Sequence, residues 1–305
     1  MTIRFTFLSA FLVCSAPSVL AQQVADTAFV STVFDPAFPE DKGPLVLIDE
    51  AHHNFHTADG RYLAFAMLLR ADGYRVRGLA EPFTRSSLEG AALLVISNAL
   101  HEDNVEDWYL PTPSAFTDEE VEAVRAWVED GGALFLIADH MPCAGAAETL
   151  ADAFGLAFQN GFAMHRESDS GRMRFSQDDG SLVHHVVLEG RGPDERVPFV
   201  VSFTGQAFRA TRQVDPILVV PEGVDLLLPE IAWNFSKRTP RISAGGLLQG
   251  ALLRQGDGRV AAFGEAAMFT AQKSNGNRMG MNDPEAPHNR QFALNVVRWL
   301  TGVLD

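Results

Sequence analysis

The sequence has 305 residues, of which 47% are hydrophobic, and its formal net charge is −15 at pH 7. This length and composition suffice for one large domain or two modest domains with a real core. The negative charge argues against a nucleic acid or an anionic membrane surface as a partner.

The N-terminal segment 1–21 has the pattern of a secretory signal peptide. Arg4 gives a short positive region, residues 5–13 are apolar, and a small-residue cleavage site ends at Ala21. The apolar part is short for a membrane span, and no later segment reaches that length. We therefore expect an exported protein, periplasmic or secreted, without a membrane span. Without this peptide Cys143 is the one cysteine left, so no internal disulfide is expected.

After the leader, the pattern predicts strands that alternate with helices. Residues 22–43 are polar and contain proline, which indicates an extended lead-in. Strands are expected at 45–49, 74–79, 92–97 and 133–138, and helices at 62–69, 118–128 and 144–154. Such alternation is typical of a mostly parallel sheet with helices on both faces.

The clearest helix start in the chain lies at Thr117. Glu120 stands three residues later, which makes a capping box, and apolar residues at helical spacing follow. Gly131 and Gly132 end this helix.

The second half of the chain is less regular. Residues 159–245 contain polar, Gly-rich sequence and strand-like pieces that the pattern does not order. Two apolar runs then flank the turn 255–258, which predicts a β-hairpin, and an amphipathic helix follows near the C-terminus. We therefore expect one α/β domain over 44–305, with an irregular insertion at about 159–245.

Several stretches together resemble the class I glutamine amidotransferase-like superfamily, which has a flavodoxin-like fold. They are residues 45–49, 131–140, 259–269 and 289–300, within a resemblance that covers roughly 44–156 and 245–303. In the amidotransferases the turn after one central strand presents a nucleophilic Cys, paired with a late His and Glu. Here His140 stands nearest that place, Cys143 is displaced, and no His-Pro-Glu occurs near Glu265. The resemblance therefore implies the fold of an exported bacterial branch that lacks the Cys-His-Glu triad.

Acidic and imidazole side chains follow the expected strands 45–49 and 133–138. Carboxylates and neutral imidazoles are the ordinary protein ligands of Zn, Mn or Fe, and in parallel sheets the carboxyl ends of strands form the ligand crevice. The expected metal ligands are Asp49, His52, His53, His56, Asp139 and His140. The expected catalytic residues are Glu50, Glu265 and His140, and the expected substrate-binding residues are Asn98, Asn282, His288 and Asn289.

These residues favour a metal-assisted hydrolase that acts on a small-molecule or envelope-derived substrate. The metal would lower the pKa of a bound water, and Glu50 or Glu265 would act as the general base. No nucleotide cofactor is expected. The simpler alternative is a polar loop whose histidines cap strands and bind water.

A different class of function is a non-catalytic module that binds carbohydrates or envelope components. The segments 108–109 and 233–235, both rich in aromatic residues, favour it, as does the missing triad. An amidase with Cys143 as nucleophile is a third alternative, although a free cysteine is more often a small buried residue. Arg166, Arg172 and Arg174 fit either an anionic substrate or a solvated loop.

Overall fold

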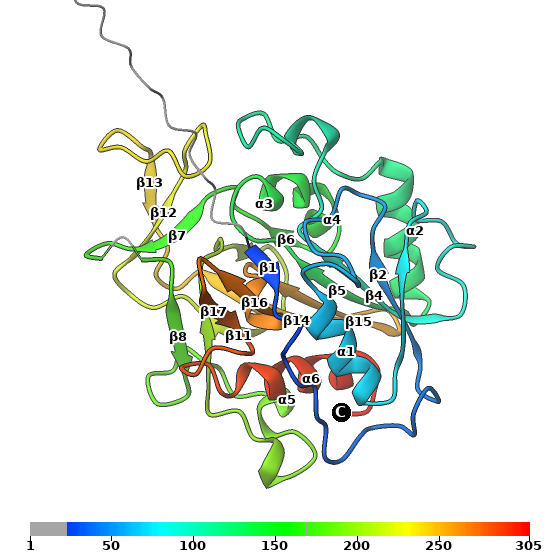
Figure 1. Ribbon diagram of the computed structural model, residues 1–305. Helices are drawn as coiled ribbons and strands as arrows, with labels where there is room; N and C mark the ends of the chain where they lie inside the picture. Colours follow the sequence, from blue (N-terminus) through cyan, green and yellow to red (C-terminus); the bar gives the residue numbers. More distant parts are fainter. Residues whose placement is uncertain (1–22, 169) are drawn as a thin grey trace, which may run out of the picture.

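The computed structural model describes residues 23–168 and 170–305, so the expected signal peptide lies outside the described residues. The helices are α1 (Leu63–Ala71), α2 (Asp118–Glu129), α3 (Cys143–Ala146), α4 (Glu148–Asp152), α5 (Val186–Glu189) and α6 (Asn289–Leu300) (Figure 1). Short 3₁₀ turns lie at Glu102–Asn104, Pro193–Glu195 and Ala267–Phe269. Within the described part of the chain, no helix has the length and apolar character needed to cross a membrane.

A central sheet of seven strands organises the molecule. Its members are β2 (Leu45–Asp49), β3 (Arg75–Leu79), β4 (Ala91–Ser97), β5 (Ala133–Ile137), β11 (Asp215–Val219), β14 (Leu248–Gln255) and β15 (Gly258–Phe263). Their order is β11-β14-β15-β5-β4-β2-β3, and the five strands from β15 to β3 are parallel. The chain first steps from β2 out to β3 and then crosses to β4 on the other side, so the direction of winding reverses between β2 and β4. This confirms the expected mixed α/β architecture with a mostly parallel sheet.

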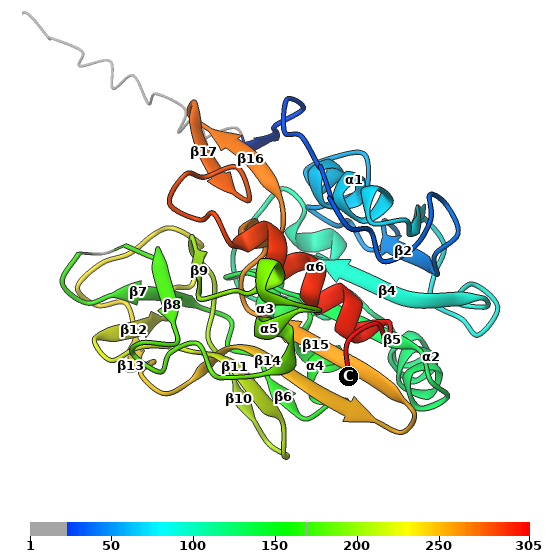
Figure 2. The ribbon, with the colours of Figure 1, turned by 90° about the horizontal axis from the view of Figure 1, so that it is seen from below.

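Helices cover both faces of this sheet. Phe65 of α1 and Phe292 of α6 belong to a core cluster on one face, together with Phe135 of β5. Val124 of α2 and Leu150 of α4 belong to the cluster on the other face. Figure 2 shows α6 lying along the sheet, with α2 beyond its far side. Neighbouring residues of a strand point to opposite faces, so each buried strand serves both clusters.

Small antiparallel sheets accompany the central sheet, and the insertion supplies most of their strands. The other strands are β1 (Gln23–Ala25), β6 (Leu156–Ala157), β7 (Phe162–His165), β8 (Met173–Ser176), β9 (Phe199–Ser202), β10 (Arg209–Ala210), β12 (Val224–Leu227), β13 (Arg241–Ser243), β16 (Ala271–Ser274) and β17 (Asn277–Gly280). They pair as β1-β16-β17, β6-β10, β7-β12-β13 and β8-β9. The insertion also contributes β11, which extends the central sheet as an edge strand.

Most expected elements of the regular part are present, with one correction. The capping box at Thr117 and Glu120 is formed in both directions, and β14 and β15 form the expected hairpin. The single helix expected at 144–154 is wrong, because the backbone breaks at Ala147 and leaves the short helices α3 and α4. The division of the chain into one domain with an insertion stays a prediction.

A buried ion pair ties α6 to the end of α1. Both guanidinium contacts of Arg298 with Asp72 are short, at 2.8 Å from Nε and 2.6 Å from Nη2, and both side chains are almost fully buried. Nη1 of Arg298 also donates to Glu195, at 2.7 Å. One arginine therefore joins the first helix, the insertion and the last helix.

Removing one partner of this pair should destabilise the fold. We expect Asp72→Ala to lower the free energy of unfolding by about 3 kcal/mol, because it leaves Arg298 buried with much of its charge unpaired. Urea denaturation followed by circular dichroism measures this change. Glu122→Ala is the matched control, since its carboxylate pairs with Arg125 on the surface. Equal shifts of the urea midpoint in the two variants would contradict the prediction.

Candidate functional site at the carboxyl edge of the sheet

Four neighbouring parallel strands end in polar residues at one edge of the sheet. In sheet order, β15 leads to Glu265, β5 to Asp139, β4 to Asn98, and β2 ends at Asp49. Parallel register places these strand ends side by side. The edge also includes the place where the winding reverses, where open α/β sheets usually bind their ligands.

Asn98 fixes the geometry between β4 and β5. Its side-chain Oδ1 accepts a hydrogen bond from the backbone N–H of Asp139 at 2.8 Å, and its own N–H donates to the carbonyl of Ile137. Its φ is +52°, a left-handed conformation that few residues besides glycine adopt readily. Asn98 is one of the predicted substrate-binding residues, and its buried side chain positions the backbone of Asp139.

Glu265 is buried beside Asp139. Its carboxyl oxygens accept the backbone N–H groups of Ala267 at 3.0 Å and Met268 at 2.8 Å. Burial, and then the charge of Asp139, raise the pKa of Glu265 well above its usual value. A buried carboxyl group held in this way is poorly placed to act as a general base on an exposed substrate.

His52 lies between two carboxylates. Its Nδ1 is 2.9 Å from Asp49 and its Nε2 is 2.8 Å from Glu120, and the ring packs against Phe83 and Phe116. Burial acts to lower the pKa of His52, but the hydrogen bonds and charges of Asp49 and Glu120 outweigh it and raise the pKa. Both ring nitrogens are engaged, so His52 joins the end of β2 to the start of α2.

Glu120 was missed as a partner of this cluster. The sequence marks it as the residue three positions after the cap in the capping box, and its carboxylate does accept the backbone N–H of Thr117. Its second oxygen also contacts His52 and accepts the N–H of Phe83. No pattern in the sequence announces a contact between residues 68 positions apart.

His56 and His53 lie away from the cluster. The Nδ1 of His56 is 3.2 Å from the Ser97 hydroxyl, and its Nε2 is 3.1 Å from Nε2 of Gln272, which donates. Burial and the charge of Arg61 lower the pKa of His56 to about 3, so the ring is neutral. His53 is exposed and has a left-handed backbone with φ +46°.

Most of the remaining expected site residues form hydrogen bonds or packing contacts with other residues of the protein. Glu50 accepts the N–H of Ala58 and packs over Gly78 of β3. Asn282 donates to Asp26, Asn289 exchanges hydrogen bonds with the backbone of Val201, and His288 packs edge-on against Phe199. Cys143 is buried, and burial, followed by the charge of Asp139, raises its pKa well above the usual value.

The expected metal ligands do not make a common site. The ring nitrogens of His52 and His56 already have partners, and the oxygens of Asp49 accept from Ala51 and Asn54. Over 23–168 and 170–305, no three His, Cys, Asp or Glu side chains are arranged to hold a metal ion. The donor set therefore does not fit Zn, Mn or Fe.

An aromatic shelf surrounds His140 at the end of β5. We use this name for Trp108, His140, Phe162, Trp233 and Phe235. The His140 ring stacks on Phe162 with centroids 4.3 Å apart, and Trp233 meets it edge-on at 4.7 Å. The Nδ1 of His140 lies 2.7 Å from the Met141 carbonyl, so in the neutral ring Nδ1 carries the proton and Nε2 is an acceptor.

Two loops from distant parts of the chain build this shelf. Leu110 donates to the carbonyl of Glu230, and Ala232 donates to the carbonyl of Trp108. The next residue, Trp233, is 44% exposed and has φ +65°. A bulky residue in this conformation is uncommon and costs backbone strain. The structure thus brings together the two aromatic segments of the sequence, and adds Phe162, which the sequence did not mark.

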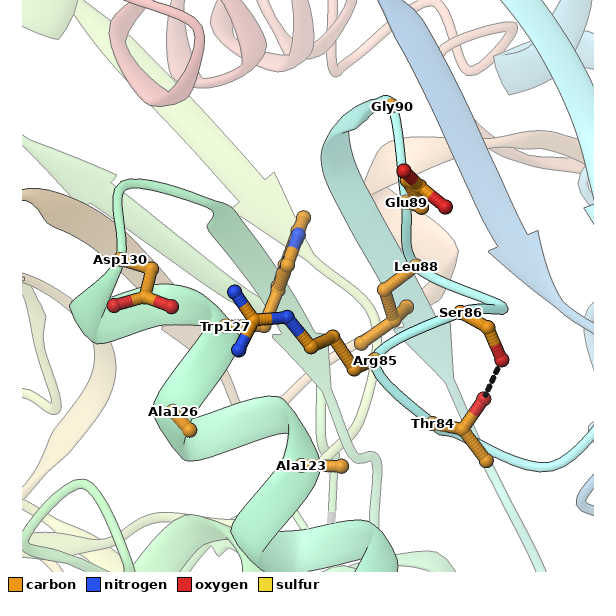
Figure 3. Close-up of a pocket in the computed structure, with 10 residues that line it drawn as sticks. All are labelled: Thr84, Arg85, Ser86, Leu88, Glu89, Gly90, Ala123, Ala126, Trp127 and Asp130. Carbon is orange, nitrogen blue, oxygen red and sulfur yellow. Dashed lines mark hydrogen bonds between the residues drawn. The ribbon is translucent and has the colours of Figure 1, made fainter.

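A separate concavity of about 690 Å³ lies between α2 and the segment before β4. Figure 3 shows that Trp127 and Arg85 line it, together with small residues of α2. The Trp127 indole packs directly against Gly132, where a Cβ would come within 2.4 Å of the ring. A larger residue at position 132 would therefore displace the indole. None of the expected site residues lines this concavity.

Comparison of the sequence with protein-family models and with curated proteins finds no match. A solved structure described as "mmIFT52 N-terminal domain" has a TM-score of 0.58 at 14% identity, covering 84% of this chain and 97% of that one. Two ThuA-like proteins are also similar. The protein from Bacteroides uniformis has a TM-score of 0.45 at 12% identity, covering 89% of this chain and 94% of that one. The protein from Parabacteroides merdae has a TM-score of 0.45 at 11% identity, covering 85% and 91%.

The structural neighbours therefore include ThuA-like proteins, which are class I glutamine amidotransferase-like. At these identities the similarity concerns the fold alone.

The raised pKa of His52 predicts a pH dependence of stability. Its ion pairs stabilise the fold fully below the unfolded pKa of about 6.5, and this contribution is lost as the pH rises through the higher folded pKa. The stability difference between the wild type and His52→Gln should therefore shrink as the pH rises above about 6.5 and through the higher folded pKa. Urea denaturation at a series of pH values measures it. His184→Gln, which removes an exposed histidine, should leave the profile unchanged, and a difference that grows with pH would contradict the prediction.

Proposed function

We propose that the protein is a carbohydrate-binding module, exported to the cell envelope or the medium, whose aromatic shelf packs against a sugar ring. The observation that carries the proposal is Trp233. It is a large exposed side chain in a left-handed backbone conformation, held against His140 at the carboxyl end of a central strand.

The chemistry of the shelf suits a sugar. The C–H face of a pyranose ring is apolar and packs on an indole, while the hydroxyl groups need polar partners around the edge. Nε2 of His140 is an acceptor within the shelf, and His140 is 8% exposed. Asp139 is half-buried, and its Oδ1 accepts the N–H of His140. We propose that its other oxygen accepts from a sugar hydroxyl.

The position of the shelf supports the same proposal. The order β3-β2-β4-β5-β15 corresponds to the 2-1-3-4-5 order of flavodoxin-like folds, which bind ligands outside the carboxyl ends of the strands. The winding reverses between β2 and β4, and the shelf follows β5, the next strand beyond β4. We therefore propose a flavodoxin-like, amidotransferase-like scaffold that lacks the amidotransferase triad. The buried Cys143 does not favour the amidase alternative.

The metal-assisted hydrolase is less well supported by the geometry. Its two central histidines are engaged by neighbouring side chains, and its proposed base Glu265 is buried against backbone N–H groups. It stays a proposal, and the binding experiments below separate it from the module.

Removal of the Trp233 ring should abolish most of the sugar affinity. We expect Trp233→Ala to weaken binding by about tenfold or more, because a central stacked tryptophan usually dominates such an interface. Isothermal titration against manno-, cello- and chito-oligosaccharides and muropeptides measures the affinity. Phe34→Ala, which removes an aromatic ring that is 93% exposed and outside the shelf, is the matched control. Equal affinities of the wild type and Trp233→Ala would refute the proposal.

Binding should not require a metal. We expect the affinity for the best oligosaccharide to be the same in EDTA as in added Zn²⁺ or Mn²⁺, and the oligosaccharide to be recovered intact after incubation. Cleavage of the oligosaccharide that EDTA abolishes would instead establish the metal-assisted hydrolase.

A further inference from the structure

A second cavity lies between the antiparallel pair β8-β9 and the segment that precedes α6. It has a volume of about 540 Å³, and its lining includes two arginines, Arg172 and Arg174, although the whole chain carries a net charge of −15. Phe199 and Pro287 contribute apolar surface to the same cavity. The aromatic shelf does not line it, so the cavity is independent of the proposed sugar site.

The guanidinium group of Arg174 is held in place by an aromatic ring. Its guanidinium carbon lies 3.6 Å from the centre of the Phe199 ring. Stacking holds the planar group in place while the N–H donors along its edge stay available. Among the residues that the structure describes, no carboxylate forms an ion pair with Arg174.

Arg172 already binds carboxylate groups of the protein. Its Nη1 is 2.9 Å from Asp283, and its Nη2 is 2.9 Å from Glu285. The Glu285 side chain is 78% exposed, and an ion pair with such an exposed partner contributes little stability. The Glu285 carboxylate therefore pairs with Arg172 at the cavity wall, and an anionic ligand can displace it.

The charge of Arg174 also acts on His288, next to the cavity. His288 packs against Phe199, and burial, followed by the charge of Arg174, lowers its pKa. Against this background Glu285 is the one acidic residue among those that line the cavity.

We propose that this cavity binds a small molecule through a carboxylate or phosphate group, held by Arg174 and Arg172, and that Glu285 competes with it for Arg172. Arginine forks match both oxyanions with paired N–H donors, and such charge-assisted bonds are the strong ones. The apolar wall at Phe199 suits a ligand with an apolar body next to its anionic group.

Three variants of the full chain test the proposal by isothermal titration, with inorganic phosphate in one arm and acetate and citrate in the other. We expect Arg174→Gln to weaken binding by about ten- to a hundredfold, as loss of a charge-assisted pair does. Glu285→Gln should tighten binding several-fold, because it removes the competing carboxylate. Arg209→Gln, at an exposed arginine of β10, should leave the affinity unchanged.

The two titration arms and the three variants also give outcomes that would overturn the proposal. The arm with the higher affinity identifies the ligand's anionic group as phosphate or carboxylate. Absence of saturable binding in both arms overturns the proposal. Equal weakening in Arg174→Gln and Arg209→Gln, or no gain in Glu285→Gln, overturns it too, because the arginines would then act only through general charge. Circular dichroism shows that each variant is folded, and none of these outcomes depends on the sugar site.

Discussion

Parallel pairing of β15, β5, β4 and β2 is the constraint on which the candidate site depends. Parallel strands point in one direction, so their carboxyl ends lie on one edge, and the residues that follow them share that edge. Asn98 then fixes the spacing between two of these ends through a side-chain bond to the backbone of Asp139. The backbone register of the sheet thus determines which polar groups lie close together.

The edge holds two kinds of polar group. One kind is paired within the protein, as in the Asp49–His52–Glu120 cluster, and it joins a strand end to a helix start. The other kind borders exposed aromatic rings, as His140 and Asp139 do. The groups of the first kind are already paired, so we propose that a ligand contacts groups of the second kind.

The regular half of the fold was predictable from the sequence because its signals are local. Apolar runs marked β2, β4 and β5, and the Thr117 cap marked α2. The insertion was not predictable, because its strands are short and pair at a distance, as β7 does with β12. The site was half predictable for the same reason. The strand ends predicted Asp139 and His140. The residues that contact the ring nitrogens of His52 and His56 come from distant segments that no periodicity connects.

The position of Arg298 has a consequence for the way the chain acquires its structure. Its partner Asp72 lies 226 residues earlier, and its second partner, Glu195, lies in the insertion. Closing so long a loop has a large entropic cost before any contact repays it, and folds dominated by such contacts form slowly. The face of the sheet that α1 and α6 share is therefore completed only when the last helix has been synthesised, and until then it exposes apolar surface of the kind that promotes aggregation.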